Sequence, residues 1–156
     1  MSNFIYLSKE RLRQIEQELI ELKTNGRKGM AERIAEARSH GDLSENAEYD
    51  AAKEEQGLLE LKISKLEELL SKAQIIDTSS MPRDRVHILA KVKVKNLKVN
   101  KEFTYTLVSA EEADIQQQKI AYTSPVGQAL MGSKVGDTVT ANVPAGEIKF
   151  QILSID

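Results

Sequence analysis

The stretch GDLSENAEY at residues 41–49 is the point about which the chain divides. It lies at a break between two long segments with helical periodicity, and it carries three acids, Asp42, Glu45 and Glu48, within seven residues. Gly41 marks the end of the first segment, because glycine in a helix interior costs about 1 kcal/mol relative to alanine. We therefore expect an exposed turn that presents carboxylates.

Apolar residues recur at intervals of three and four on both sides of this turn, which is the spacing of a coiled-coil interface. The series are Leu12, Ile15, Leu19 and Leu22 before the turn, and Leu59, Ile63, Leu66, Leu70 and Ala73 after it. Neither series reaches four heptads, which argues against a long dimeric coiled coil. The series mirror each other about residue 44, with Leu19 opposite Leu70 and Met30 opposite Leu58. This predicts an antiparallel helical hairpin roughly 50 Å long.

The first helix of this hairpin contains an irregularity. Gly26 and Gly29 lie inside it, and Leu22 is followed by the next apolar interface residue, Met30, only eight positions later. Each glycine weakens the helix by about 1 kcal/mol relative to alanine. We expect a bend or local loosening there, with close approach of the two helices as the alternative role of the glycines.

Asp42 and Glu45 admit two readings. Their spacing fits a capping box at the start of the second helix, and acids in a first turn stabilise a helix by about 0.3–1 kcal/mol each. Alternatively, two carboxylates match the ligands that Mg²⁺ takes beside water and phosphate oxygens. They are too few and too solvated to hold the ion alone, but they could complete a two-metal site that a partner already half supplies. One carboxylate can serve both roles.

Composition excludes several classes of site. The 156 residues include no cysteine, which rules out disulfides and thiolate metal sites, and no apolar run is long enough to span a membrane. We expect a cytoplasmic protein. Residues 42–55 carry six acids and one base, which argues against this segment gripping nucleic acid by charge.

The second half of the chain changes character after Asp77. The segment DTSSMP at residues 77–82 is a predicted linker, so we expect two domains, residues 1–77 and 78–156. Alternating apolar residues predict strands that begin at Val86, run through Phe103–Leu107, and close the domain near Phe150. Ser124 and Pro125 predict the start of a short helix. The expected class is α+β, with a helical hairpin followed by an antiparallel sheet and one short helix.

Two blocks resemble the signatures of the bacterial Gre transcript-cleavage factors: EARSHGDLSENAEY at residues 36–49, and SPVGQALMG at 124–132 continuing through Val135-Gly136-Asp137. The resemblance spans essentially the whole chain. It implies an FKBP-like second domain and an N-terminal arm that enters the secondary channel of a backtracked RNA polymerase. The polymerase then cuts its own nascent RNA near the 3′ end, so the chain would be a cofactor of polymerase and not itself an enzyme.

The resemblance also assigns residues. It implies that Asp42 and Glu45 help bind a catalytic Mg²⁺ held jointly with polymerase, the isolated protein holding none. It implies that Ser44, Asn46, Glu48 and Tyr49 support the tip. It further implies that Arg38 and Lys53 could contact RNA, and that Ser124, Pro125 and Gly127 dock on polymerase. For Arg38 and Lys53 the alternative is a solvated ion pair, and for the last three it is a capped, tightly packed helix. We expect a monomer without a membrane partner.

Three other functions remain open to test. A channel-binding inhibitor of polymerase would share the architecture, although the Asp42 and Glu45 pair argues against it. A chaperone-like or purely structural coiled coil would leave the tip acids dispensable. An FKBP-like domain also raises prolyl isomerase activity, which we do not expect, because the module offers only four aromatic residues to bury a proline ring: Phe103, Tyr105, Tyr122 and Phe150.

Overall fold

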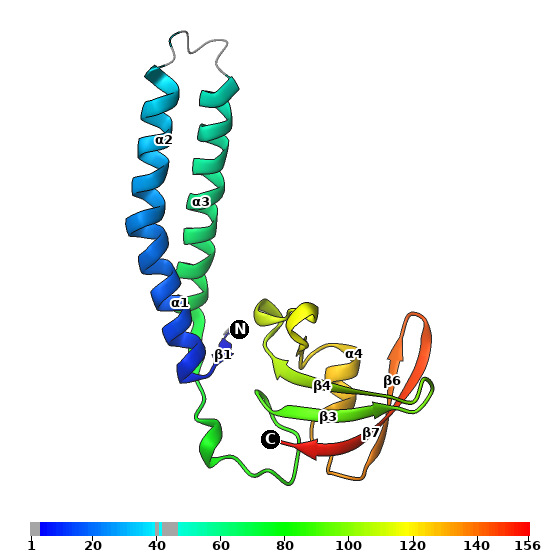
Figure 1. The fold of residues 1–156 in the computed structure, drawn as a ribbon. Helices are drawn as coiled ribbons and strands as arrows, with labels where there is room; N and C mark the ends of the chain where they lie inside the picture. Colours follow the sequence, from blue (N-terminus) through cyan, green and yellow to red (C-terminus); the bar gives the residue numbers. More distant parts are fainter. Residues whose placement is uncertain (1–3, 40, 42–46) are drawn as a thin grey trace. The chain divides into compact units, whose positions relative to one another are not determined.

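The computed structural model describes residues 4–39, 41 and 47–156, which form two compact units (Figure 1). One unit is the helical hairpin Glu10–Lys72, which we call the arm. The other combines the chain through Lys9 with Ala73–Asp156. The sequence placed a single boundary after Asp77, whereas the structure divides the chain after Lys9 and after Lys72. No helix within the described ranges is long and apolar enough to cross a membrane.

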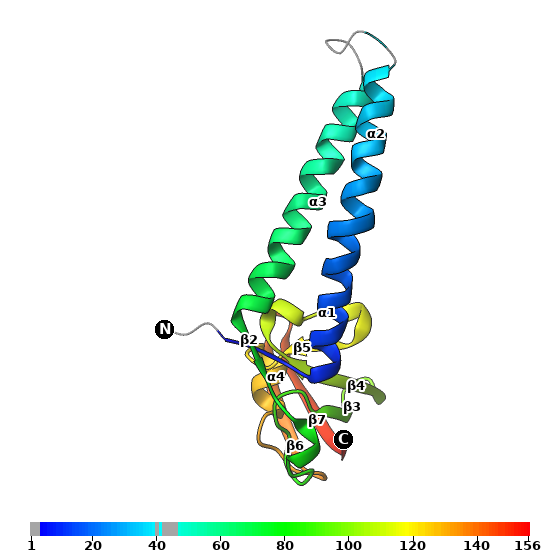
Figure 2. The same cartoon turned by 90° about the vertical axis from the view of Figure 1, so that its left-hand side faces the viewer.

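The arm consists of two helical runs packed side by side (Figures 1 and 2). The first comprises α1 (Lys9–Glu21), a π-helical turn η1 (Leu22–Gly26) and α2 (Arg27–Ser39), and the second is α3 (Ala47–Lys72). The predicted hairpin and its irregularity near Gly26 are confirmed. The irregularity is a π turn, which inserts one residue into a helix and so explains an eight-residue spacing where a heptad would give seven.

The interface between the two runs follows the predicted apolar series with two exceptions. Ile15, Leu19 and Ile63 are buried as expected. Leu58, however, is 61% exposed, so its predicted pairing with Met30 is wrong, and the neighbouring Leu59 packs near Gly26 instead. The series also ends before Ala73, because α3 stops at Lys72 and Ala73 begins a strand.

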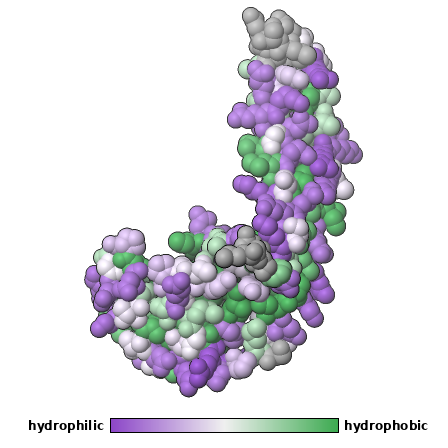
Figure 3. All heavy atoms as spheres, turned by 180° about the vertical axis from the view of Figure 1, so that it is seen from behind, coloured by the Kyte–Doolittle hydropathy of each residue, from purple (hydrophilic) through white to green (hydrophobic). Residues whose placement is uncertain are grey.

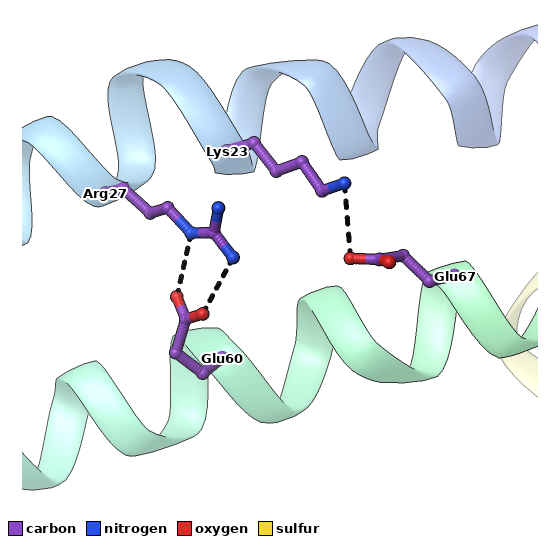
Figure 4. A network of polar contacts seen from close by, with 4 residues as sticks. All are labelled: Lys23, Arg27, Glu60 and Glu67. Atoms are coloured by element: carbon purple, nitrogen blue, oxygen red, sulfur yellow. Dashed lines mark hydrogen bonds and ion pairs between the residues drawn. The ribbon is translucent and has the colours of Figure 1, made fainter.

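Ion pairs join the two runs along the solvent-exposed sides of the arm. The pairs are Glu18–Lys62 and Lys23–Glu67 at 3.2 Å, Arg27–Glu60 at 2.8 Å, and Arg33–Glu55. Figure 4 shows Lys23 and Arg27 reaching from one helix to the glutamates of the other. Exposed pairs contribute about 0–1 kcal/mol each, so they support the helix pairing that the apolar residues establish. Hydrophilic residues cover most of the arm on the face drawn in Figure 3.

The second unit contains two sheets. Strand β1 (Ile5–Leu7) pairs in parallel with β2 (Ala73–Ile75). The larger sheet has the order β5-β4-β3-β7-β6. Its strands are β3 (Lys91–Asn96), β4 (Lys101–Val108), β5 (Lys119–Ala121), β6 (Thr138–Val143) and β7 (Gly146–Ile155).

The larger sheet is mixed, which corrects the prediction of an antiparallel sheet. Strands β4 and β5 pair in parallel, and the remaining pairs are antiparallel. Antiparallel neighbours can be joined by a tight turn, whereas parallel neighbours need a longer crossover. The chain between β4 and β5 supplies it with two 3₁₀ turns, Ala110–Glu112 and Ile115–Gln117. The α+β class and the short helix α4 (Pro125–Leu130) agree with the prediction.

One face of this sheet packs with α4 to form the core. Leu130 of α4 is fully buried among Val92, Val94, Phe150 and Ile152. The predicted strand from Val86 is too long, because β3 begins only at Lys91. Residues 86–90 form a turn in which Leu89 has φ of 68° and Ala90 N–H donates to the His87 carbonyl at 3.1 Å. Val86 and Ala90 at the two ends of this turn are buried in the core, which explains why they are apolar although they lie outside β3.

Candidate functional site at the end of the arm

The arm reverses direction between Ser39, where α2 ends, and Ala47, where α3 begins. Gly41 has φ of +105°, a conformation that favours glycine, and its N–H donates to the Arg38 carbonyl at 3.4 Å. A glycine with positive φ just beyond the last turn is a common way to end a helix. This local geometry explains why the first helical run stops here.

The residues expected to carry the chemistry lie mostly between these helix ends. Asp42, Ser44, Glu45 and Asn46 are outside the described residues, so their catalytic, supporting and capping roles remain predictions. Glu48 and Asp50 lie in the first turn of α3, where the partial positive charge of a helix N-terminus favours acids.

Arg38 and Tyr49 meet across the end of the arm. The guanidinium carbon of Arg38 lies 5.7 Å from the centre of the half-buried Tyr49 ring, within the range of a cation–π contact. The tyrosine expected to support the tip therefore contacts a cation that comes from the other helix. Arg38 itself remains exposed, so this contact leaves room for an anion to approach.

Arg38 and Lys53 come together on one side of the arm. They line a surface hollow of about 430 Å³ together with Ala31, Ile34, Ala35 and Gln56. The Lys53 ammonium donates to the Gln56 side-chain carbonyl at 2.9 Å, which holds it at the rim. Two cations on neighbouring helices are thereby placed around one hollow, and such a hollow can accept a phosphate group.

A second hollow of about 420 Å³ lies at the same end of the arm. Its lining residues are Arg33, Glu36, Ala37, Ala47, Glu48 and Ala51. Ala37 and Ala52 are 4% and 0% exposed, because small side chains allow the two helices to approach closely there. Sequence reasoning missed Arg33, Glu36 and Gln56 as residues that line the two hollows. The alanines clustered at residues 31–37 and 47–52 could have indicated that the two helices approach each other closely at this end of the arm.

The donor set fits a magnesium ion only in part. Among the residues that the structure describes, no group of three or more His, Cys, Asp or Glu side chains could hold a metal ion. Asp42 and Glu45 add two carboxylates, and Mg²⁺ commonly takes one or two carboxylates beside waters and phosphate oxygens. The chemistry of these two residues fits a shared ion.

The three residues predicted to dock on a partner form the start of α4. The Ser124 hydroxyl accepts from Gly127 N–H at 3.1 Å and donates to the Ala121 carbonyl at 2.6 Å, and Pro125 occupies the first turn. Gly127 is buried, and a Cβ there would lie 2.2 Å from the Ala121 carbonyl oxygen. Capping and tight packing thus account for Ser124 and Gly127. Pro125 is exposed, and the docking role remains a prediction.

Comparison with known proteins covers both units. A family model described as the C-terminal part of the transcription elongation factors GreA/GreB matches residues 81–156, and one described as the N-terminal part of a transcription elongation factor matches residues 5–75. The transcription elongation factor GreA of Chlorobaculum parvum is 54% identical over 156 residues, which cover 99% of this chain and 98% of the relative.

Two further relatives are similar over the same length. GreA of Amoebophilus asiaticus is 49% identical over 155 residues, covering 99% of both chains. The crystal structure of GreA factor homolog 1 of Thermus thermophilus is 25% identical, covers 99% of both chains and has a TM-score of 0.47.

Proposed function

The chain belongs to the GreA/GreB family of transcription elongation factors, and from this premise we propose that it stimulates transcript cleavage by RNA polymerase. In this proposal the arm enters the secondary channel of a backtracked polymerase in the cytoplasm, and the nascent RNA is cut near its 3′ end. The chain acts as a monomeric cofactor, and polymerase supplies the rest of the active site.

The observation that carries this proposal is the geometry of the arm. Its first run, residues 9–39, is about 45 Å long at 1.5 Å per residue, and among the described residues of the arm α3 is the one helix that packs beside it. The segment that contains Asp42 and Glu45 joins the two helices at their far end. A structure only two helices thick can bring two carboxylates into a site that a globular domain would be too wide to reach.

The side chains at the end of the arm have distinct proposed roles. Asp42 and Glu45 would hold a Mg²⁺ ion jointly with polymerase. When bound, that ion would lower the pKa of a water molecule and stabilise charge on the phosphate. Arg38 and Lys53 would bind an RNA phosphate at the hollow that they line, and Tyr49 would orient Arg38 for that contact.

The second unit would dock on polymerase through the start of α4. Pro125 supplies exposed apolar surface there, while Ser124 and Gly127 fix the conformation of the turn that presents it. The docking contact and the tip chemistry are thus proposed for different units. Substitutions at the tip should therefore leave binding to polymerase intact.

A cleavage assay tests the proposal. Backtracked polymerase complexes with labelled RNA are mixed with Mg²⁺ and with the parent protein, the Asp42→Ala/Glu45→Ala variant or Asp50→Ala. Asp50 is the matched control, since it is another acid in the first turn of α3. We expect the double variant to lower the cleavage rate about 100-fold or more, equivalent to about 2.7 kcal/mol of activation free energy. Its affinity for polymerase should stay that of the parent. The Asp50→Ala variant should cleave at the rate of the parent.

Three results would overturn this account. Full activity of the double variant would leave Asp42 and Glu45 with only a capping role. Polymerase binding by the parent without any cleavage would instead identify an inhibitor. Absence of both binding and cleavage would indicate a structural coiled coil.

A further inference from the structure

Both helical runs of the arm contain a glycine at one level along its length. The first contains Gly29, which follows soon after the π turn Leu22–Gly26, and the second contains Gly57 within the continuous helix α3. Two ion pairs between the runs bracket this level, because Arg27 pairs with Glu60 and Arg33 pairs with Glu55. Gly29 and Gly57 each lie between the residues of these two pairs, so the weak points of both helices coincide.

Packing does not require Gly29 or Gly57. A Cβ added at either position would meet no atom within 4 Å, and neither residue has a positive φ. Gly26 differs, because its Cβ would lie 3.3 Å from a methyl carbon of Leu59. A glycine in a helix interior weakens it relative to alanine, and at Gly29 and Gly57 no contact explains that loss.

Burial in the arm is concentrated on either side of this level. The described residues that are buried are Ile15, Leu19 and Ile63 toward the base of the arm, and Ala37 and Ala52 toward its tip. No described residue of the arm between these two groups is buried. Leu58 and Leu61 are instead 61% and 51% exposed. Because apolar burial supplies most of the force that holds two helices together, the middle of the arm is held least firmly.

The π turn can persist because its polar groups have partners. The Thr24 hydroxyl donates to the Ile20 carbonyl at 2.7 Å, and the Asn25 amide donates to the Glu21 carboxylate at 2.9 Å. These local bonds compensate where the regular pattern of backbone hydrogen bonds changes. π turns and inserted side-chain hydrogen bonds are among the known causes of bends in helices.

We propose that this level, residues 27–33 in the first run together with residues 55–60 in α3, is a joint. At the joint the part of the arm that carries the tip bends relative to the part near Glu10 and Lys72. The bending lets the carboxylates of the tip adjust their position inside the partner. This last consequence rests on the proposed function, whereas the joint itself belongs to the isolated chain.

Distance measurements between two spin labels test the joint directly. The sequence contains no cysteine, so Gln17→Cys and Ala35→Cys can be labelled uniquely, about 27 Å apart for 18 helical residues. We expect a broad distance distribution in the parent and a narrow one in the Gly29→Ala/Gly57→Ala variant. The matched control, Ser64→Ala/Ser71→Ala, raises helix propensity in α3 away from the joint and should keep the broad distribution. An equally narrow distribution in all three proteins would overturn the proposal.

A paired measurement of stability and activity tests what the joint does. Each glycine substitution should raise the midpoint of thermal unfolding by about 2–4 °C. In the cleavage assay, the double glycine variant should lower the cleavage rate at saturating protein several-fold. The protein concentration that gives half of the maximal rate should stay unchanged, and the Ser64→Ala/Ser71→Ala control should cleave at the rate of the parent. A stabilised variant with an unchanged rate would show that bending plays no part in activity. If even the parent gives no cleavage, only the proposed function fails, because the distances still decide whether the joint exists.

Discussion

Gly127 shows what a single residue contributes to the second unit. It lies in the first turn of α4, where a Cβ would come within 2.2 Å of the Ala121 carbonyl and 2.8 Å of the Tyr122 Cα. Both obstacles are backbone atoms, so no side chain can move aside. The helix can approach the strand this closely only because residue 127 has no side chain.

Gly127→Ala should therefore lower the free energy of unfolding by about 1–3 kcal/mol, the usual cost of overpacking. Urea denaturation followed by circular dichroism measures it, with Ala129→Gly on the same helix as a comparison that introduces no clash. An unchanged denaturation midpoint for Gly127→Ala would mean that α4 can shift without cost, and the packing argument would be wrong.

The features of α4 differ in how far the sequence reveals them. Ser124 and Pro125 predicted the helix start correctly, because a cap and a first-turn proline act on their own neighbours. The clash at Gly127 depends on a strand that is only brought close by folding, so no local pattern announces it. At the tip, Arg38, Tyr49 and Lys53 could be named from sequence, but not the contact between the Arg38 guanidinium and the Tyr49 ring, which come from different helices.

At the scale of elements, the π turn explains why the apolar series of the first helix shifts by one position. Deleting Asn25 would bring Leu22 and Met30 back to a seven-residue spacing, which suits an uninterrupted α-helix. We expect the deletion variant to keep its helix content by circular dichroism and to unfold at a temperature no lower than the parent.

Deletion of Gln17 is the matched control for the Asn25 deletion. It removes one residue where the spacing is already regular, so it rotates Ile15 away from the face shared by Leu19 and Leu22. Loss of one such buried contact should cost about 2–5 kcal/mol. Equal destabilisation by the two deletions would contradict the assignment of the extra residue to the π turn.

The ion pairs of the arm predict a dependence of its stability on pH. Two hydrogen bonds from Arg27, at 2.8 and 3.0 Å, hold the pKa of Glu60 below its ordinary value of 4.5. A lowered pKa in the folded state means that the stabilisation is present above the ordinary pKa and is lost as pH falls through the lowered one. The midpoint of thermal unfolding should therefore fall on acidification below about pH 4.5.

Glu60→Gln should weaken this acid dependence, whereas Glu54→Gln, another exposed acid on α3, should leave it unchanged. Both variants are compared with the parent in thermal melts at a series of pH values. The contribution is small because both partners of the pair are about half exposed. Parallel pH profiles for the parent and Glu60→Gln would show that the pair does not stabilise the arm.

At the scale of the whole molecule, the chain ties its two ends into one unit. Ile5 and Leu7 of β1 are 2% and 1% exposed, and Tyr6 N–H donates to the buried Ser109 hydroxyl at 2.9 Å. The Tyr6 ring also meets the Tyr122 ring edge-on at 6.4 Å. The N-terminal strand β1 is therefore a structural part of the second unit, although the arm separates β1 from the rest of that unit in sequence.

Leu7→Ala should destabilise the second unit by about 2–5 kcal/mol, since it removes most of a fully buried side chain. Protection of β3 and β7 amides in hydrogen exchange reports on this unit separately from the arm. The comparison is Phe4→Ala, because Phe4 precedes β1 and is 48% exposed. Equal protection in Leu7→Ala and the parent would exclude β1 from the cooperative unit.

The sequence predicted the parts of the molecule that local pattern determines, and missed those that depend on distant pairing. The hairpin, the strands β4, β6 and β7 and the capped helix α4 follow from periodicity and caps. Strands β1 and β2 have three residues each, too few to show alternation. The apolar residues near Ile120 predict a short strand, which β5 confirms, but its parallel pairing with β4 is fixed only when the chain has folded, which is why the sheet was expected to be antiparallel.

The central claim is that Asp42 and Glu45 supply ligands to an ion inside polymerase, and a Mg²⁺ titration of the cleavage rate tests it most directly. Rates are measured with backtracked complexes for the parent, Glu45→Ala and Asp50→Ala. The account predicts that Glu45→Ala raises the half-saturating Mg²⁺ concentration about tenfold or more, as for loss of about 1.4 kcal/mol of binding free energy, while Asp50→Ala matches the parent. The same half-saturating concentration for all three proteins would contradict it.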